Sequence, residues 1–383
     1  MIAGVARAAQ RALWIPVGYL AAVTIAGLRY SPPRPALSEE TRFVVLVPAH
    51  DEEASVAETV SSLLAAEYPA ERRRVVVVAD NCTDETADRA SAAGADVWAR
   101  DDLDAPGKGP ALRWAIDRLL EDEDWDAAVL VDADTVVDLG FLGALAARLD
   151  DGAEVLQAEY RVANPDESLV TRLAQISFAI QSGLRQRGRA ALGGAAKLQG
   201  NGMAFRRSVL ARDGWLGEGA VEDIDMWLRL LERGVRPQFA PDAIVAGLMP
   251  ETAAAARVQR GRWESGRSEL ARERLVPAVE TAIRHRDPVL LEAAVTTLAF
   301  PPLTTLAALV AGVGAARWAA TGRVGSAPAQ LAVLGAHAVA ALAVTKAPRS
   351  SYALLALAPA VVGWKLAVKL GSGRPQGWQR TPR

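Results

Sequence analysis

Acidic side chains follow three short apolar stretches of the sequence, each at the point where the stretch ends. Glu52 follows the first stretch and Asp80 the second, while Asp132 and Asp134 both follow the third. Alternate residues of an extended segment point the same way, so Asp132 and Asp134 present two hard oxygen ligands together. This pair suits a divalent cation that carries a diphosphate. Capping of the next helix explains any single cluster more simply, and the coincidence of three clusters favours a site.

Two further motifs carry charge that could act on a substrate. Lys108 lies between two glycines, but the remaining residues of a P-loop are missing, and a solvated turn lysine explains it equally well. Glu222 and Asp223 precede the amphipathic stretch IDMWLRLLERG, so capping of that helix is the alternative to a chemical role.

The stretch QRGRW brings an amide, a guanidinium and an indole together. Its side chains of interest are Gln259, Arg262 and Trp263. Arginine suits a diphosphate because its fork of donors can contact two oxygens, and the indole offers a flat face to a sugar. An amphipathic interfacial helix explains the same stretch equally well when it is taken in isolation.

A sheet is needed to position these side chains, and the segment from Thr41 to Ala278 alternates strand and helix patterns. Continuous β-branched runs bounded by turn residues predict buried strands at Arg42 to Pro48, Arg74 to Ala79 and Ala127 to Val131. Helical patterns follow the first two, at Ser55 to Ala66 and at Asp84 to Ala93, the latter opened by a Thr83–Asp84 cap. We therefore expect a doubly wound α/β domain whose ligands lie at the carboxyl ends of its strands.

Apolar segments concentrate at the two ends of the chain. Ala12 to Leu28 carries no charge and is just long enough to span a bilayer, with a cleaved signal peptide as the alternative. Three more helices are expected at Ala293 to Ala315, Pro328 to Val344 and Tyr352 to Val368, with buried soluble helices as the alternative. Pro301 and Pro302 should kink or split the first of these three.

Composition and charge narrow the function classes. Lys and Arg number 43 against 45 Asp and Glu, a net charge of -2, so no nucleic-acid partner is expected. The single cysteine, Cys82, cannot close an intramolecular disulfide or build a thiolate zinc cluster. Four segments are expected in the 383 residues: an N-terminal membrane anchor at 1–40, a catalytic domain at 41–278, a membrane region with about three helices at 279–370 and a basic tail at 371–383.

The order of the motifs resembles glycosyltransferase family two, the inverting enzymes of the GT-A fold. The resemblance is strongest to the membrane-embedded branch with cellulose, chitin and hyaluronan synthases. The motifs that carry it are PAHDEE at 48–53, DNCTD at 80–84, DAD at 132–134, ED at 222–223 and QRGRW at 259–263. DxD alone is a weak signal, whereas QxxRW after DxD and ED is specific. The resemblance covers Thr41 to Arg267 and implies a Rossmann-like GT-A catalytic domain with flanking transmembrane helices.

The resemblance also implies a transfer from a nucleotide-sugar donor, in which charge growing on the departing diphosphate must be neutralised. Asp134 would hold Mg²⁺ or Mn²⁺, which acts as a Lewis acid at the leaving group. The other donor contacts implied are Glu52, Asp80, Lys108, Asp132 and Arg262, with Asp80 accepting from a uracil ring of a UDP-sugar.

On the acceptor side, Asp223 matches the carboxylate that acts as general base. It takes the proton of the acceptor hydroxyl, which attacks the anomeric carbon from the face opposite the diphosphate and inverts its configuration. Such a base needs placement within hydrogen-bond reach more than strength. Gln259 and Trp263 would contact the acceptor, with the indole stacking on a sugar.

Several alternatives stay open at this stage. Val221 stands where polymerising members usually carry threonine, so one transfer or many is not decided. A sugar nucleotidyltransferase would need a glycine-rich, arginine-containing loop in place of PAHDEE. A catalytically idle membrane scaffold or glycan-binding subunit would be signalled by a lost carboxylate, and none of the motif aspartates is missing.

The expected location is the cell (inner) membrane, as a multi-pass protein whose catalytic domain is cytoplasmic, where nucleotide sugars are made. Basic residues flank the apolar segments on both sides, so the positive-inside rule does not decide the orientation. The expected partners are the nucleotide-sugar donor, a lipid or glycan acceptor, and membrane lipids.

Overall fold

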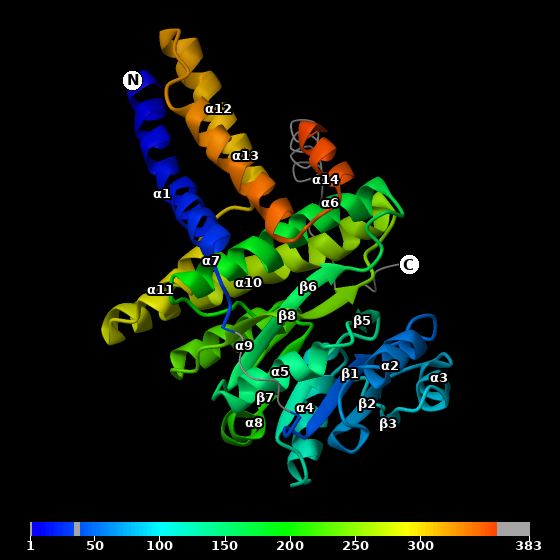
Figure 1. The fold of residues 1–383 in the computed structure, drawn as a ribbon. Coiled ribbons are helices and arrows are strands. Elements are labelled where there is room, and N and C mark those ends of the chain that lie inside the picture. The colour runs from blue at the N-terminus through cyan, green and yellow to red at the C-terminus, as the bar shows by residue number, and fades with distance from the viewer. Residues whose placement is uncertain (1, 34–38, 358–383) are drawn as a thin grey trace.

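The computed structural model describes residues 2–33 and 39–357 of the chain. Figure 1 shows a sheet with covering helices at the bottom, a middle layer of helices, and long helices at the top. The middle layer consists of α6 (Leu169–Phe178), α7 (Arg185–Ala191) and α10 (Ala253–His285), and the long helices are α1 (Ile2–Arg29), α12 (Leu303–Thr321) and α13 (Ala327–Val344).

Within the described residues, the sheet has eight strands in the order β3-β2-β1-β4-β7-β6-β8-β5. Their bounds are β1 (Phe43–Ala49), β2 (Arg73–Asp80), β3 (Asp96–Arg100), β4 (Ala127–Leu130), β5 (Thr135–Val137), β6 (Val155–Val162), β7 (Met203–Arg206) and β8 (Gln238–Gly247). Strand β1 pairs in parallel with β2 and β4, and β2 pairs in parallel with β3, as a doubly wound sheet requires. The other half is mixed, because β7 runs antiparallel to both β4 and β6.

The central strands are buried on both faces, which explains their continuous apolar sequences. Alternate residues of β1 enter opposite cores, with Val44 and Leu46 on one face and Val45 and Val47 on the other. Helices α4 (Lys108–Leu120) and α9 (Glu222–Glu232) cover the first face, while α2 (Val56–Leu64) and α5 (Phe141–Asp150) cover the second. The predicted strands and the helix after β1 are therefore confirmed within two residues at each end.

The helix after β2 begins later than expected. Helix α3 (Thr86–Ala92) has Glu85 at its cap position, and Glu85 makes no capping hydrogen bond through its side chain. Instead the backbone N–H of Thr86 donates to Asp84 Oδ1 at 3.0 Å, from one residue before the cap. The expected Thr83–Asp84 cap is thus wrong in position, because the acidic turn continues for one residue more.

Helices α1, α12 and α13 are each long and apolar enough to cross a membrane. The helix expected from Ala293 is split, as the prolines predict: α11 (Pro288–Ala294) and the π-helical turn η4 (Val295–Ala299) end before Pro301, and α12 begins after Pro302. The last expected helix, Tyr352 to Val368, lies mostly outside the described residues. Its described part contains the end of α14 (Arg349–Ala353) and the short η5 (Leu354–Leu357).

The middle layer of helices packs directly against the long apolar helices. A Cβ on Gly188 of α7 would lie 2.4 Å from the carbonyl oxygen of Val23 in α1, so only glycine allows this approach. Helix α10 continues without interruption to His285, past the expected domain boundary after residue 278. That boundary therefore stays a proposal.

Candidate active site

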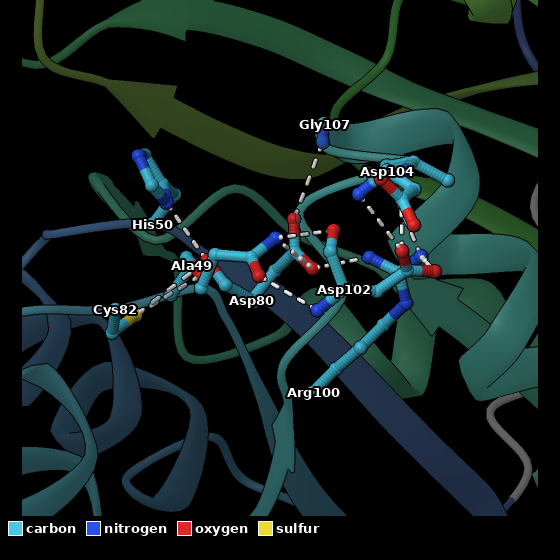
Figure 2. Close-up of polar contacts among 10 residues, drawn as sticks. Ala49, His50, Asp80, Cys82, Arg100, Asp102, Asp104 and Gly107 are labelled. Carbon is cyan, nitrogen blue, oxygen red and sulfur yellow. Dashed lines mark hydrogen bonds and ion pairs between the residues drawn. The ribbon is translucent and has the colours of Figure 1, made fainter.

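The carboxylate of Asp80, at the end of β2, is buried and held by hydrogen bonds from three directions (Figure 2). Its Oδ1 accepts from the guanidinium of Arg100 and from Asn81 Nδ2 at 3.2 Å, and its Oδ2 accepts from the backbone N–H of Gly107 at 3.2 Å. The Nδ1 of His50 lies 2.7 Å from the carbonyl oxygen of Asp80. The charge of this carboxylate is thus compensated and its orientation fixed. Sequence reasoning missed Arg100, because no motif surrounds it.

Glu52 lies at the same edge of the sheet, just after β1. Its backbone N–H donates to Thr86 Oγ1 at 2.7 Å, and its Oε2 accepts from Ser55 Oγ at 3.2 Å. The structure therefore places Glu52 at the expected edge and also links it to the segment that opens α2. Both the donor contact and a local structural role are compatible with these contacts.

The turn after β4, which carries Asp132 and Asp134, is fixed by a buried asparagine. Asn201 Oδ1 accepts from the backbone N–H of Asp132 at 3.2 Å, and Asn201 Nδ2 donates to Thr135 Oγ1 at 2.8 Å. The carbonyl oxygen of Asp134 accepts from the backbone N–H of Leu248 at 3.0 Å. Asn201 had a sequence signal, since it stands between two glycines, but its role depends on a contact that spans 66 residues.

Lys108 connects this turn to the opposite side of the site. Its Nζ donates to Asp132 and, at 2.6 Å, to the carbonyl oxygen of Gly200. Gly200 has φ +78, and a Cβ there would lie 3.5 Å from Lys108 Nζ and 3.6 Å from Asp223 Oδ2. Gly200 is therefore the common neighbour of one cation and one carboxylate. The alternative that Lys108 is a lysine of a turn, surrounded by solvent, is therefore wrong, because Lys108 begins α4 and its Nζ contacts Asp132 and Gly200.

The acidic pair at the start of α9 has an unusual electrostatic environment. Burial raises the pKa of Asp223 above its ordinary value, although Lys197 and Lys108 oppose this. Burial likewise raises the pKa of Glu222 to about 7, against Lys108 and with the help of Asp223. Val221 occupies the cap position, so neither acid is the N-cap residue that the capping explanation required.

The cations opposite this pair are perturbed too. Burial alone would lower the pKa of Lys108, but Asp132, Glu222 and Asp223 raise it above its ordinary value. Burial lowers the pKa of Lys197 to about 8, although Asp223 opposes this. Lys197 was missed by sequence reasoning, because it lies in an irregular segment before β7 and belongs to no motif.

Asp225, two residues after Asp223, has a different role. It is 2% exposed, and its Oδ2 accepts from Arg229 Nε at 2.8 Å and from the backbone N–H of Glu218 at 3.2 Å. Arg274 Nε lies 3.6 Å from its other oxygen. These contacts identify Asp225 as a structural carboxylate that ties α9 to α10.

Gln259, Arg262 and Trp263 lie on the first half of α10, and their spacing places them on one face of that helix. One turn further, a Cβ on Gly266 would lie 3.0 Å from Ala220, so α10 packs directly beside the start of α9. Trp263 is 39% exposed. Among the described residues, no ion pair joins Arg262 to a carboxylate.

The donor set of this corner fits a divalent cation. Asp132 and Asp134 supply hard carboxylate oxygens, and the ammonium group of Lys108 already lies between Asp132 and a carbonyl oxygen. This corner therefore accommodates positive charge. A second group of possible ligand atoms, within 4.8 Å of one another, belongs to Asp51, Cys82 and Asp84.

Comparison with known proteins gives a consistent family. The model of a family described as glycosyltransferase like family 2 matches residues 41–266. The chain is 28% identical over 238 residues to the probable glycosyltransferase YdaM of Bacillus subtilis (strain 168), covering 61% of this chain and 57% of that protein.

Two further relatives have more specific names. The chain is 26% identical over 230 residues to poly-beta-1,6-N-acetyl-D-glucosamine synthase of Staphylococcus aureus (strain COL), covering 59% of this chain and 54% of that protein. It is 30% identical over 233 residues to beta-monoglucosyldiacylglycerol synthase of Nostoc sp., covering 58% and 48%. The chain thus spans about half the length of the curated relatives it matches.

Among solved structures, the mannosyltransferase PcManGT from Pyrobaculum calidifontis, in complex with GDP-Man and Mn²⁺, has a TM-score of 0.55 at 19% identity. The alignment covers 89% of this chain and 99% of that one, so the likeness extends beyond residues 41–266. At this identity it shows the fold.

Proposed function

The chain belongs to the glycosyltransferase like family 2, and on that premise we propose that it is a membrane-bound inverting transferase with Asp223 as general base. The donor is a nucleotide sugar, with UDP as its carrier. The acceptor is lipid-linked or a polysaccharide. Mg²⁺ or Mn²⁺ assists, held by Asp134 together with Asp132.

The observation that carries this proposal is the convergence at Gly200. Lys108 comes from α4 and Asp223 from α9, and both lie beside this glycine. Lys108 also contacts Asp132, in the turn after β4. A transferase of this type needs positive charge where the diphosphate departs and a base close to the anomeric carbon. Three unrelated elements supply these groups within a few ångströms.

The reaction follows from the placement of these side chains. Lys108 and Arg262 contact the diphosphate, and Asp223 accepts the proton of the acceptor hydroxyl as its oxygen bonds to the anomeric carbon. The bond from that carbon to the diphosphate breaks in the same displacement. A bound divalent ion supplies Lewis-acid stabilisation to the leaving diphosphate. Asp80, oriented by Arg100, accepts an N–H of the base.

Asp80 by itself does not distinguish uracil from guanine, since both bases can donate an N–H to a carboxylate. PcManGT is in complex with GDP-Man, so a GDP-sugar is the second candidate donor. The two named relatives differ in product, a glycan in one and a glycolipid in the other. Both acceptor classes therefore belong in the test.

Three helices long and apolar enough to cross a bilayer support an integral membrane protein. The direct packing of α7 on α1 holds the catalytic domain against these helices. We place that domain on the cytoplasmic side of the cell membrane, where nucleotide sugars are made, with the acceptor presented at the bilayer surface. The four-segment division of the chain is part of the same proposal.

The test is an activity panel on the purified full-length protein in detergent. Radiolabelled UDP-glucose, UDP-N-acetylglucosamine and GDP-mannose are each supplied with Mn²⁺, Mg²⁺ or excess chelator, with lipid extract or oligosaccharide as acceptor. We expect divalent-dependent transfer from one nucleotide class. Nucleotide binding without turnover in any combination would favour the idle glycan-binding subunit instead.

A further inference from the structure

Three basic side chains gather between Asp223 and the long apolar helices. We refer to Arg185, Lys197 and Arg267 as the basic cluster. Arg185 begins α7, Lys197 lies in the segment that leads to β7, and Arg267 is on α10. Gln186, the residue after Arg185, holds the backbone of Lys197: its Oε1 accepts from Lys197 N–H at 2.9 Å, and its Nε2 donates to the Lys197 carbonyl oxygen at 2.7 Å. Besides burial, Arg185 and Arg267 lower the pKa of Lys197, as close positive charges do.

The neighbouring arginines of α7 are paired, whereas the basic cluster is not. Arg187 Nη2 lies 2.6 Å from Glu159 Oε2, and Arg189 Nε donates to Glu292 Oε1 at 3.0 Å. Among the described residues, no carboxylate lies within 4.0 Å of the charged nitrogens of the basic cluster. Partly desolvated cations without a counter-ion are unfavourable, so an anionic ligand would stabilise this arrangement.

The carboxylates nearest to the basic cluster leave it with an excess of positive charge. Asp223 lies close enough to Lys197 for each to shift the pKa of the other. As the proposed base, however, Asp223 must keep an oxygen free to accept a proton. Glu264 opposes the lowered pKa of Arg267 from one turn earlier on α10, but its side chain is exposed. Glu292 is already paired with Arg189. The three cations thus have one carboxylate beside them, Asp223, that is not paired elsewhere.

The position of the basic cluster points to the membrane. Arg185 Nε donates to His337 Nε2 of α13 at 3.5 Å, and three residues later Gly188 packs on Val23 of α1. In Figure 1, α7 lies directly below α1, with α10 alongside it. A ligand at the basic cluster would therefore lie between the long apolar helices and Asp223.

We propose that Arg185, Lys197 and Arg267 bind a phosphate group in the headgroup of a membrane lipid, and that this lipid is the acceptor. That this lipid is the acceptor rests on the proposed function. That the basic cluster binds a lipid phosphate does not. The donor diphosphate has its own contacts in Lys108 and Arg262. Two phosphate sites of different origin therefore flank Asp223.

The experiment is calorimetry on the full-length protein in detergent, saturated with UDP and Mn²⁺ so that the donor site is filled. The probes are dihexanoyl phosphatidic acid, dihexanoylglycerol, which lacks only the phosphate, and inorganic phosphate. We expect phosphatidic acid to bind at least about tenfold more tightly than either of the others, since the site recognises a phosphate on an apolar carrier.

The variant is Lys197→Gln combined with Arg267→Gln, and the control is Arg272→Gln, an exposed arginine on the same helix. The double variant should lose about tenfold or more in phosphatidic acid affinity and keep its UDP affinity. The control should match the unmodified protein in both. Lys197→Arg should retain binding, which separates a charge effect from a folding defect.

Three results would overturn the proposal: unchanged phosphatidic acid affinity in the double variant, equal binding of dihexanoylglycerol or inorganic phosphate, or a parallel loss of UDP affinity. The last would assign the basic cluster to the donor diphosphate. Failure of every nucleotide sugar to support transfer would instead end the proposed function and leave the lipid-phosphate binding result intact.

Discussion

The two sides of the site treat their carboxylates differently. Asp80, on the side expected to hold the nucleoside, is buried with Arg100 and a backbone N–H bonded to its oxygens. Asp223, on the side expected to hold the acceptor, is also enclosed, yet burial raises its pKa despite two nearby lysines. The negative charge of Asp80 is thus compensated by fixed donors, whereas the raised pKa of Asp223 favours binding of a proton.

On the proposed function, this difference is the one expected between a binding group and a reacting group. A carboxylate whose charge is matched by fixed donors is suited to orient a ligand, whereas a raised pKa brings a base closer to neutral pH, where proton transfer is efficient. Asp225 sharpens the contrast within a single helix, because its pairing with Arg229 resembles that of Asp80 and not that of Asp223.

The largest expected effect is on the metal corner. Asp134→Ala should reduce transfer by about 10³-fold or more, because the departing diphosphate loses its stabilising cation. Excess chelator on the unmodified protein should reproduce the loss. Asp151→Ala, at the exposed end of α5, is the control and should be active. Full activity in excess chelator would show that transfer does not require a divalent cation.

The next largest effect on transfer is expected for Lys108→Gln, which changes both the donor side and the environment of Asp223. Transfer should fall by about 10²-fold, since the cation beside Asp132 and Gly200 is lost. Lys108 also lowers the pKa values of Glu222 and Asp223, so the acid limb of the rate profile should move to higher pH without it. A pH series of single-turnover rates measures both effects, and an unmoved limb would show that Lys108 does not act on the base.

A smaller effect is expected on α10. Trp263→Ala should raise the acceptor KM by about tenfold through lost stacking, with the donor dissociation constant unchanged. Trp263→Phe, which keeps an aromatic face, should recover most of the affinity. Because Trp263 is partly exposed, Tm should hardly change. Equal losses of donor and acceptor affinity would contradict a role of Trp263 in acceptor binding alone.

The smallest effects are on the stability of the fold. A substitution on the nucleoside side should lower stability, whereas one on the acceptor side should raise it. Asp80→Asn leaves buried Arg100 with less compensation and should cost about 1–3 kcal/mol. Glu222→Gln should raise Tm by a few degrees at pH 8 and leave it unchanged at pH 4. Thermal unfolding at both pH values measures this, and a lower Tm for Glu222→Gln at pH 8 would contradict it.

The sign for Glu222 follows from its pKa, which is raised from 4.5 to about 7 in the folded protein. Below pH 4.5 both folded and unfolded states hold the proton, and the glutamine mimics that form. As pH rises toward 7 the unfolded state ionises first, so folding stability is lost. The glutamine removes this loss.

Sequence patterns predicted the parallel half of the fold because β1, β2 and β4 are continuous apolar runs. They did not predict the mixed half, since β7 is a strand of four residues whose direction depends on pairing with β4 and β6. The split of the helix before α12 was predictable because proline acts locally.

The same division between local and distant effects applies to the site. The acids at strand ends were predictable because they are local to each strand. Arg100, Lys197 and Asn201 were not assigned roles, because their contacts join segments that the sequence pattern does not bring together. The role of Lys108 was left open for the same reason, since its partners Asp132 and Gly200 lie 24 and 92 residues away.

The central claim is that Asp223 reacts while Asp80 binds, and Asp223→Asn tests it most directly. Donor dissociation constant and single-turnover transfer are measured on the same preparation. We predict a dissociation constant within about twofold of the unmodified protein and transfer reduced by about 10²-fold or more. Unmodified turnover in this variant, or a donor affinity that falls as much as the rate, would contradict the assignment of Asp223 as the base.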